Sequence, residues 1–380
     1  MTLTQRLPRV MLVAGTRPES LKLASLAAAL RRRDDVATLL VNSGQHAGMV
    51  EQTWAHLGLR SDLRGAQIHP VSLSHALKSL QQSVRTLARE TRAELLVVQG
   101  DTTTAYAASL AARDLGIPLA HVEAGLRTGH PYRPFPEELF RRRIARIAAL
   151  HFAPSAVAAD NLRAEKIADG AIHQVGNPGI DLLRCELPAA RALALPFLPA
   201  AGELIVLTLH RRENYGRGLD LVCTALLELL ARRPECTAIC PVHPNPVVGT
   251  RLRRRLTGHA RIVLVEPLPY RLFIALLARA RLAITDSGGI QEEAPYLGLR
   301  TLLVRQSTER PESVASGAVT LVPPNARGLV AEALRLLDQA PLPAADFCSG
   351  APHGDGRSGE RIAHCIARYV LDRQAVPVPA

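Results

Sequence analysis

Aromatic residues are scarce in this chain of 380 residues, at 3% of the sequence, with 6 Phe, 6 Tyr and 1 Trp. Basic residues outnumber acidic ones, giving a formal net charge of +12, and arginines form the runs 31–33, 141–143 and 253–255. Because the aromatic residues do not alternate with these runs, a base-stacking nucleic-acid surface is not indicated. We interpret the runs as solvated helix faces, with attraction of polyanions or of an acidic membrane surface as the alternative. The positive charge favours a small anionic substrate, and we expect no nucleic acid as partner.

Signals for metal binding, dinucleotide binding and membrane insertion are missing from the sequence. The 6 cysteines are scattered, and only Cys236 and Cys240 lie close together, so no metal site is expected. No Gly-x-Gly-x-x-Gly, P-loop or Gly-x-Ser-x-Gly pattern follows an expected strand, so we expect no cofactor. Charges interrupt every apolar run before it reaches membrane-spanning length, and residues 1–8 lack the apolar core of a signal peptide. We therefore expect a cytoplasmic protein without a membrane span.

Strand-like apolar runs alternate with helix-length segments along the whole chain. The chain exceeds the size at which one core usually stops growing, and such alternation is typical of parallel sheets covered by helices on both faces. We predict an α/β protein of two Rossmann-like, doubly wound domains facing a cleft. The predicted domains are 1–176 and 177–358, followed by a C-terminal helix at 359–380 for which packing against the first domain is one option. The expected strands are 10–14, 38–41, 95–98, 118–121, 151–153, 204–207, 237–240, 262–265, 282–285, 301–304 and 319–322, and the expected helices include 19–32, 75–91, 103–115, 219–232, 271–279 and 326–338.

The segment Asp286-Ser287-Gly288-Gly289 has the form of an anion-binding turn, because it follows an expected strand and leads into a helix. Its two glycines let a ligand approach the backbone N–H groups, where the helix dipole favours negative charge. Glu293, about one turn later, would accept hydrogen bonds from sugar hydroxyls. These features suggest a nucleotide or nucleotide-sugar site, although tight packing of a strand-to-helix turn would also require glycines.

Charged side chains follow several expected strands of the first half, at the ends where such sheets bind ligands. Arg17 and Lys22 suit a diphosphate or a carboxylate, or alternatively belong to a helix-capping turn with a solvated lysine. Asp101 stands at a helix N-terminus, either as an N-cap or as an ionised base. Glu123 follows a strand, where a carboxylate is more often functional than structural. Glu137 begins a helix, whose dipole offers it a purely structural role.

His210 follows the first expected strand of the second half. A histidine at this place can donate a proton or bind phosphate as an imidazolium, unless it is only part of a polar loop. Together with three carboxylates and no metal-ligand spacing, it fits proton transfer better than metal-assisted hydrolysis.

A series of motifs runs in order from residue 15 to residue 312. They are residues 15–19 with Lys22, Gln45-His46, 100–103, 121–128, 136–138, 210–213, His243 with Asn245-Pro246, 286–295 and 308–312. In these motifs the chain closely resembles the bacterial non-hydrolysing UDP-N-acetylglucosamine 2-epimerases, and the resemblance covers nearly its whole length. It implies a GT-B-like fold, a homodimer, and reversible conversion of UDP-N-acetylglucosamine to UDP-N-acetylmannosamine.

The resemblance also implies roles for single residues. The implied catalytic positions are Asp101, Glu123, Glu137 and His210. The implied positions for binding the UDP-sugar substrate are Arg17, Lys22, Phe273, Ser287, Gly288, Gly289, Glu293 and Arg310. Because the C2 hydrogen of an intact N-acetyl sugar is very weakly acidic, we expect UDP to leave C1 first. A carboxylate then removes the C2 proton to give a glycal, and UDP adds again after reprotonation from the opposite face.

Some positions depart from the family pattern. Phe140 stands where an Asn is usual, Leu268 replaces a frequent Gln near the uracil, and Ala47-Gly48 replaces longer polar side chains of activated members. Other functions stay open at this point. They are a 2-epimerase for a modified sugar such as a UDP-diacetamido-uronic acid, a hydrolysing epimerase, a GT-B glycosyltransferase, and a non-catalytic UDP-sugar sensor.

Overall fold

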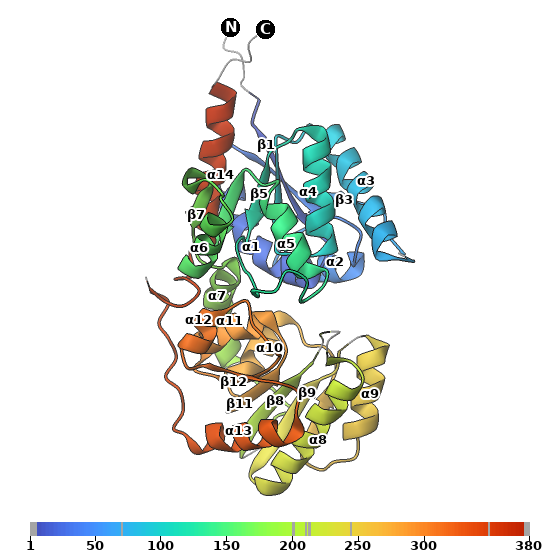
Figure 1. Ribbon diagram of the computed structural model, residues 1–380, viewed down its shortest axis with the longest axis vertical. Coiled ribbons are helices and arrows are strands. Elements are labelled where there is room, and N and C mark those ends of the chain that lie inside the picture. Colours follow the sequence, from blue (N-terminus) through green and yellow to red (C-terminus); the bar gives the residue numbers. More distant parts are fainter. Residues whose placement is uncertain are drawn as a thin grey trace. The chain divides into compact units, whose positions relative to one another are not determined.

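The computed structural model describes residues 6–69, 71–199, 202–209, 211, 214–243, 245–348 and 350–375. The chain divides into two compact units: unit 1 comprises Met1–Leu182 and His353–Ala380, and unit 2 comprises Leu183–Pro352. Each unit is built on one parallel β-sheet with helices packed on it (Figure 1). The predicted α/β class with two doubly wound sheets is confirmed. Within the described ranges, no helix has both the length and the apolar character needed to cross a membrane.

Unit 1 contains a seven-stranded sheet with the order β3-β2-β1-β4-β5-β6-β7, in which all pairs are parallel. Its strands are β1 (Arg9–Ala14), β2 (Ala37–Asn42), β3 (Leu63–Arg64), β4 (Leu95–Gln99), β5 (Leu119–Val122), β6 (Leu150–Ala153) and β7 (Ile172–Gln174). Its helices are α1 (Arg17–Arg31), α2 (Ala47–His56), α3 (Leu73–Thr91), α4 (Thr103–Leu115), α5 (Glu137–Ala145), α6 (Ala156–Ala164), the 3₁₀ turn η1 (Asp169–Ala171) and α14 (Ser358–Ala375), while α7 (Pro178–Ala192) continues into unit 2. The strand order reverses between β1 and β4, which makes their carboxyl ends a switch point where such sheets bind ligands.

Side chains of β1 alternate between two separate cores of unit 1. Val10 and Leu12 pack in the core that includes residues of α1 and α14, whereas Met11 and Val13 pack in the core that includes residues of α3 and α4. Successive side chains of a strand point to opposite faces, so a strand covered on both faces must be apolar throughout. This burial explains the unbroken apolar run in the sequence.

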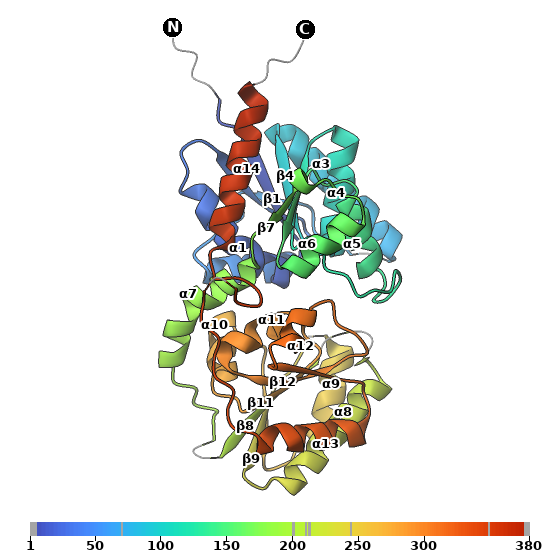
Figure 2. The same ribbon diagram turned by 60° about the vertical axis from the view of Figure 1, so that its left-hand side comes forward.

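The C-terminal helix α14 packs along α1 in unit 1 (Figure 2). At its start, the Asp181 carboxylate accepts hydrogen bonds from the backbone N–H groups of Ser358 at 2.9 Å and Gly359 at 2.6 Å. A carboxylate is stabilising there because a helix N-terminus carries partial positive charge. The predicted join at residue 176 and the unit boundary at Leu182 lie on either side of the start of α7.

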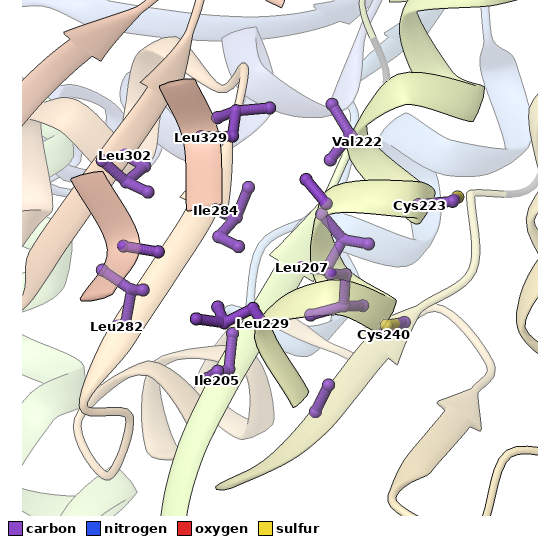
Figure 3. Packing of buried hydrophobic residues seen from close by; sticks show 14 of the residues in the cluster. Ile205, Leu207, Val222, Cys223, Leu229, Cys240, Leu282, Ile284, Leu302 and Leu329 are labelled. Atoms are coloured by element: carbon purple, nitrogen blue, oxygen red, sulfur yellow. The ribbon is translucent and has the colours of Figure 1, made fainter. Parts of the chain in front are cut away.

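Unit 2 contains a six-stranded parallel sheet with the order β10-β9-β8-β11-β12-β13. Its strands are β8 (Glu203–Thr208), β9 (Cys236–Pro241), β10 (Ile262–Val265), β11 (Leu282–Thr285), β12 (Arg300–Val304) and β13 (Val319–Val322). Its helices are α8 (Arg217–Arg232), α9 (Pro246–Leu256), α10 (Tyr270–Leu277), α11 (Gly288–Leu297), α12 (Pro311–Ala315) and α13 (Ala326–Asp338). Figure 3 shows Ile205, Leu207 and Ile284 of the sheet in one cluster with Leu229 of α8 and Leu329 of α13. The switch point of this sheet lies between β8 and β11.

The structure contains elements that the sequence does not predict, some of them very short and some containing proline. The sequence does not predict β3 and β7, which have 2 and 3 residues, because such lengths show no periodicity. It also does not predict α2, α6, α7 and α9. Helix α7 contains Pro188, and α9 begins at Pro246, and proline is unfavourable inside a helix, so it weakens a helix prediction.

Candidate active site

The buried carboxylate of Glu19 connects the turn after β1 to the turn after β4 through hydrogen bonds. Its Oε2 accepts hydrogen bonds from Gly15 N at 2.9 Å and Thr16 Oγ1 at 2.8 Å. Its Oε1 accepts one from Thr102 Oγ1 at 2.6 Å. Burial raises the pKa of Glu19 to about 7, and the hydrogen bonds oppose this rise. A Cβ on Gly15 would lie 1.9 Å from Thr104 Oγ1, so this part of the switch point in unit 1 is closely packed.

Glu123, directly after β5, has a backbone conformation that residues other than glycine rarely adopt. Its φ is 65°, in the left-handed region, which costs on the order of 1–3 kcal/mol. Its buried Oε2 contacts Lys22 Nζ and accepts hydrogen bonds from Gln99 Nε2 at 2.7 Å and Asn177 Nδ2 at 3.5 Å. Lys22, which the resemblance assigns to substrate binding, therefore lies against a carboxylate. A strained and buried acid at the end of a strand favours a functional role for Glu123.

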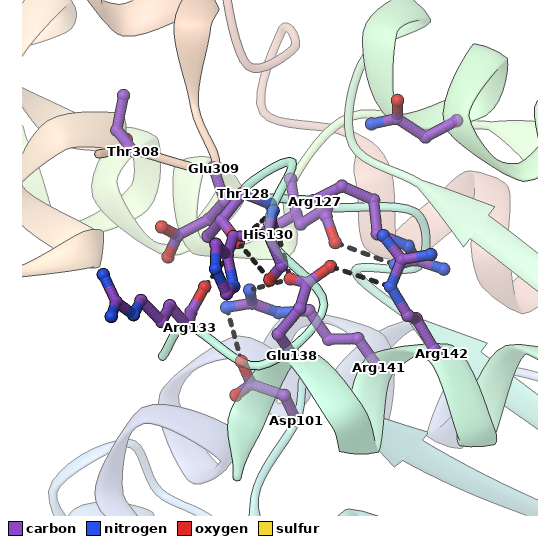
Figure 4. A network of polar contacts seen from close by, with 12 residues as sticks. Asp101, Arg127, Thr128, His130, Arg133, Glu138, Arg141, Arg142, Thr308 and Glu309 are labelled. Atoms are coloured by element: carbon purple, nitrogen blue, oxygen red, sulfur yellow. Dashed lines mark hydrogen bonds and ion pairs between the residues drawn. The ribbon is translucent and has the colours of Figure 1, made fainter. Parts of the chain in front are cut away.

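Asp101 lies between β4 and α4 but does not cap the helix. The N-cap of α4 is Thr102, whose Oγ1 accepts a hydrogen bond from Ala105 N at 3.0 Å, so the N-cap interpretation of Asp101 is wrong. Instead, Asp101 Oδ2 forms an ion pair with Arg141 Nη2 at 2.5 Å (Figure 4). The Asp101 side chain keeps 23% of its surface exposed, whereas that of Arg141 keeps 6%. The carboxylate is thus held from the protein side and accessible from the other.

The neighbouring carboxylates Glu137 and Glu138 begin α5 in opposite surroundings. Glu138 is fully buried and contacts Arg141 Nη1 at 3.1 Å and Arg142 Nε at 3.2 Å. The N–H of Thr128 also donates to it, at 3.3 Å. Glu137 is only partly buried, and its enclosed Oε2 has no hydrogen-bond partner among the described residues. Since an enclosed acceptor without a partner is costly, Glu137 is the one of the two that suits a ligand.

His121 of β5 and His151 of β6 are both buried in the sheet of unit 1. His121 Nε2 donates a hydrogen bond to the Gly100 carbonyl oxygen at 2.8 Å. Burial, the main cause, lowers the pKa of His121 to about 3 and that of His151 to about 4. Both rings are therefore neutral at neutral pH and support the sheet rather than supply protons.

We expect His121 to make the folded protein less stable in acid. Its folded-state pKa is depressed, so its contribution is fully present above about pH 6.5 and is lost as pH falls towards 3. His121→Gln has an amide donor for Gly100 and does not titrate. Between pH 6 and 4 the variant should lose about 1.4 kcal/mol less per pH unit than the parent in urea unfolding. Glu19 acts in the opposite direction in both proteins and cancels in the comparison, so equal pH slopes would contradict this prediction.

In unit 2, the N-terminus of α11 forms an accessible turn. Ser287 precedes the helix, which begins at Gly288. A Cβ on Gly288 would lie 3.1 Å from the Arg310 guanidinium. A Cβ on Gly289 would meet, among the described atoms, only Ser287 Oγ at 3.9 Å. The absence of a side chain at Gly288 therefore leaves room for the Arg310 guanidinium. The absence of one at Gly289 leaves the first N–H groups of α11 accessible to an anion.

Arg310 is held at this turn by two buried carboxylates. Its Nε contacts Glu292 Oε1 at 2.5 Å, and its Nη1 contacts Glu309 Oε1 at 2.5 Å. Arg305 Nη1 binds the other oxygen of Glu309 at 2.9 Å. All four side chains are almost fully buried. A guanidinium fixed in this way presents a rigid cation, which suits recognition of a phosphate.

Helix α10 supplies a partner for Glu293 of α11. The Tyr270 hydroxyl donates to Glu293 Oε1 at 2.8 Å. Burial and the nearby Glu293 charge raise the pKa of Tyr270 well above its ordinary value, so it remains a donor. Phe273 lies on the same helix and is partly buried. The sequence does not indicate Tyr270, because nothing in its local pattern distinguishes it from a core residue.

Asp286 has a structural role at the switch point of unit 2. Its Oδ2 accepts hydrogen bonds from Arg211 N at 3.0 Å and Asn214 Nδ2 at 2.9 Å. It thereby ties the loop after β8 to the end of β11. His210, which the sequence predicts to be catalytic, lies outside the described residues. Arg17, at the start of α1 in unit 1, is partly buried, and burial lowers its pKa.

One group of described residues has the spacing of metal ligands, namely Glu203, Glu235 and Cys236. Glu203 is paired with Arg281 at 3.4 Å and Glu235 with Arg233 at 3.5 Å. The group lies at the amino ends of β8 and β9, opposite to the edge that carries the site residues of unit 2. Its carboxylates already have cationic partners, and we assign no metal to it.

Comparisons with known proteins agree with this arrangement. The family model described as UDP-N-acetylglucosamine 2-epimerase matches residues 28–367. The chain belongs to this family. It is 37% identical over 371 residues to the UDP-N-acetylglucosamine 2-epimerase of Salmonella typhimurium, covering 95% of this chain and 99% of that protein. It is 36% identical over 369 residues to the enzyme of that name from Escherichia coli K12, covering 94% and 98%.

Solved structures of similar proteins support the same assignment. A UDP-GlcNAc 2-epimerase from Neisseria meningitidis, solved with UDP-GlcNAc bound, superposes with a TM-score of 0.89 at 32% identity, covering 95% of this chain and 100% of that one. A Staphylococcus aureus protein solved with UDP gives a TM-score of 0.88 at 30% identity, covering 96% and 97%. The predicted GT-B-like epimerase fold is therefore confirmed.

Two residues of this family member correct or refine the sequence interpretation. Phe140, which replaces the usual Asn, is buried and stacks on Tyr106 with ring centroids 4.6 Å apart, so it belongs to the core of unit 1. Arg141 is also buried, so the interpretation of the run 141–143 as a wholly solvated face is wrong. Successive side chains of an α-helix point about 100° apart around its axis. Phe140 can therefore pack in the core of unit 1 while its neighbour Arg141 pairs with Asp101.

Proposed function

We propose that this chain interconverts UDP-N-acetylglucosamine and UDP-N-acetylmannosamine by reversible epimerisation at C2. The observation that carries the proposal is Glu123, a buried carboxylate in a strained conformation at the carboxyl end of β5. Asp101 follows β4, the strand paired with β5, so two acids lie at neighbouring strand ends. The matching family has this activity as its name, and the similar Neisseria meningitidis structure contains UDP-GlcNAc.

The chemistry needs groups that move protons and a site that accepts a leaving diphosphate. Cleavage of the C1–O bond releases UDP with the bond's electron pair and gives C1 oxocarbenium character. The C2–H bond then loses its proton to a carboxylate, and its electrons form the C1=C2 double bond of a glycal. Delivery of a proton to the opposite face of C2 and return of UDP to C1 complete the inversion. Asp101, Glu123 and Glu137 are our candidates for these transfers, without an assignment of faces.

We assign binding of the UDP moiety to Ser287, Gly288 and Gly289 with Arg310, because an open helix N-terminus and a fixed guanidinium both stabilise a diphosphate. Glu293, held by Tyr270, is our candidate acceptor for ribose hydroxyls. Phe273, Arg17 and Lys22 remain proposed binding residues. His210 remains a proposed stabiliser of the departing diphosphate.

The test is an NMR time course of the purified chain with UDP-N-acetylglucosamine in D₂O. We expect a second UDP-sugar to form up to a constant ratio, with deuterium at C2 of both sugars, because the proton removed exchanges with solvent. Conversion without deuterium at C2 would contradict the elimination mechanism. Accumulation of free UDP with N-acetylmannosamine would indicate a hydrolysing epimerase. A chain inert towards this sugar but active on a UDP-diacetamido-uronic acid would show that the substrate is a modified sugar.

The homodimer implied by the resemblance stays a prediction, as do the cytoplasmic location and the domain limits. Sedimentation equilibrium of the full chain would give its mass in solution, and a monomer of 41.0 kDa at all concentrations would contradict the dimer.

A further inference from the structure

Arg141 of α5 joins an interior carboxylate to a carboxylate of the candidate active site. Its Nη1 contacts Glu138 Oε2 at 3.1 Å, and its Nη2 contacts Asp101 Oδ2 at 2.5 Å. Figure 4 shows the guanidinium between these two acids. Because guanidinium is planar and its N–H groups have fixed directions, one contact determines where the other can form.

The interior end of this connection is itself immobilised. Glu138 has no exposed surface and receives a hydrogen bond from the Thr128 N–H and a contact from Arg142. Arg142 Nη1 continues to Glu165 at 3.0 Å, and Glu165 is bound by Arg127 through two contacts at 2.8 and 2.7 Å. Arg141 is therefore anchored by a continuous network within unit 1, whereas Asp101 on its other side is partly exposed.

We propose that Arg141 is a positioning residue that orients the Asp101 carboxylate for proton transfer. The proposal rests on the proposed function, in which Asp101 is one of the reacting acids. The Asp101 loop follows β4, and without Arg141 its short side chain would rotate between rotamers and meet water. A misplacement of about 1 Å in a reacting group can reduce the rate about 100-fold.

A purely structural role makes a different prediction. If Arg141 only neutralised buried Glu138, its loss would lower stability and leave turnover per folded molecule unchanged. Glu138 would still keep the contact with Arg142 and the Thr128 N–H, so we expect an Arg141 variant to fold. Trp54 is the only tryptophan and is buried in unit 1, where its Nε1 donates to the Ser20 carbonyl oxygen at 3.1 Å. Its emission therefore reports folding of the unit that contains Arg141.

The experiment compares Arg141→Gln, Arg141→Lys and Arg142→Gln in the full chain. Arg141→Gln should lower kcat about 100-fold with KM for UDP-N-acetylglucosamine within about threefold of the parent, which marks loss of an interaction needed in the transition state. Arg141→Lys keeps the charge without the fork and should recover part of kcat. Arg142→Gln also removes one positive charge from α5 and one contact to Glu138, but it leaves the ion pair between Arg141 and Asp101 in place. It should keep kcat within about threefold.

Comparison with the parent separates this inference from the proposed function. If the parent chain converts the sugar and Arg141→Gln, with parent-like Trp54 emission, keeps its kcat, Arg141 does not position Asp101. Equal kcat losses in Arg141→Gln and Arg142→Gln would also overturn the proposal. If Arg141→Gln loses the parent's Trp54 emission, the Arg141→Lys variant is used for the test instead. A folded Arg141→Lys variant with the parent's kcat would show that the paired contacts of the guanidinium to Glu138 and Asp101 are not needed for turnover. A parent chain that makes no UDP-N-acetylmannosamine would instead contradict the proposed function.

Discussion

Replacing Glu123 by Gln should reduce kcat about 1,000-fold while leaving UDP affinity nearly unchanged. The substitution keeps the size of the side chain but removes the group that we propose to exchange a proton with C2, and such groups contribute roughly 100- to 10,000-fold. UDP affinity depends in our proposal mainly on unit 2, whose residues the substitution does not alter. The measurements are initial rates by NMR and UDP binding by calorimetry.

The cost of this substitution to folding can be separated from its effect on catalysis. Lys22 is buried and loses its charged partner in Glu123→Gln, so the melting temperature should fall. Rates are therefore compared well below the lower melting temperature. Glu94→Gln is a matched control, because Glu94 accepts from Arg9 N at 3.4 Å next to the amino end of β4, away from the candidate site. Parent-like kcat in Glu123→Gln would remove Glu123 from the proposed acids.

The positions of the candidate residues along the sheets could be predicted from the sequence, because apolar runs locate buried parallel strands and polar residues follow them. The surroundings of these residues could not. Asp101 and Thr102 are both good N-cap residues, and only the backbone shows that Thr102 caps α4. Glu137 and Glu138 are indistinguishable in sequence, yet one is enclosed by two arginines and the other has an oxygen without a partner among the residues described.

Long-range partners explain most of what the sequence does not show. Arg141 belongs to an arginine run that looks like a solvated face, and its burial depends on Asp101, 40 positions earlier in the chain, and on the fold that brings α5 to β4. The positive φ of Glu123 likewise has no local signal, because glutamate does not favour that conformation. Sequence patterns therefore predict which loops carry the chemistry, whereas pairing and strain within those loops depend on tertiary structure.

Arg310→Ala should weaken UDP binding by about 100-fold or more, equivalent to about 2.7 kcal/mol. We assign Arg310 to the diphosphate because its guanidinium lies 3.1 Å from where a Cβ of Gly288 would be, at the N-terminus of α11. Glu292 and Glu309 hold the Arg310 guanidinium in place. Truncation to Ala therefore removes a fixed cation from the proposed diphosphate site and lowers UDP affinity directly. Arg310→Lys should lie between the parent and Arg310→Ala, since lysine keeps the charge but not the fork. Calorimetric titration with UDP measures all three affinities.

Stability should fall in Arg310→Ala for a separate reason. Glu292 and Glu309 each lose a 2.5 Å contact to a cation, and breaking a buried ion pair from one side costs roughly 3–5 kcal/mol. Arg305 still binds Glu309 at 2.9 Å, which limits the loss at that carboxylate. Arg335→Ala is the control in the same unit, because Arg335 forms an exposed pair with Glu332 and should affect neither property. If Arg310→Ala melts earlier but binds UDP as the parent does, Arg310 only neutralises the two buried acids and the diphosphate is held by the α11 N-terminus without it.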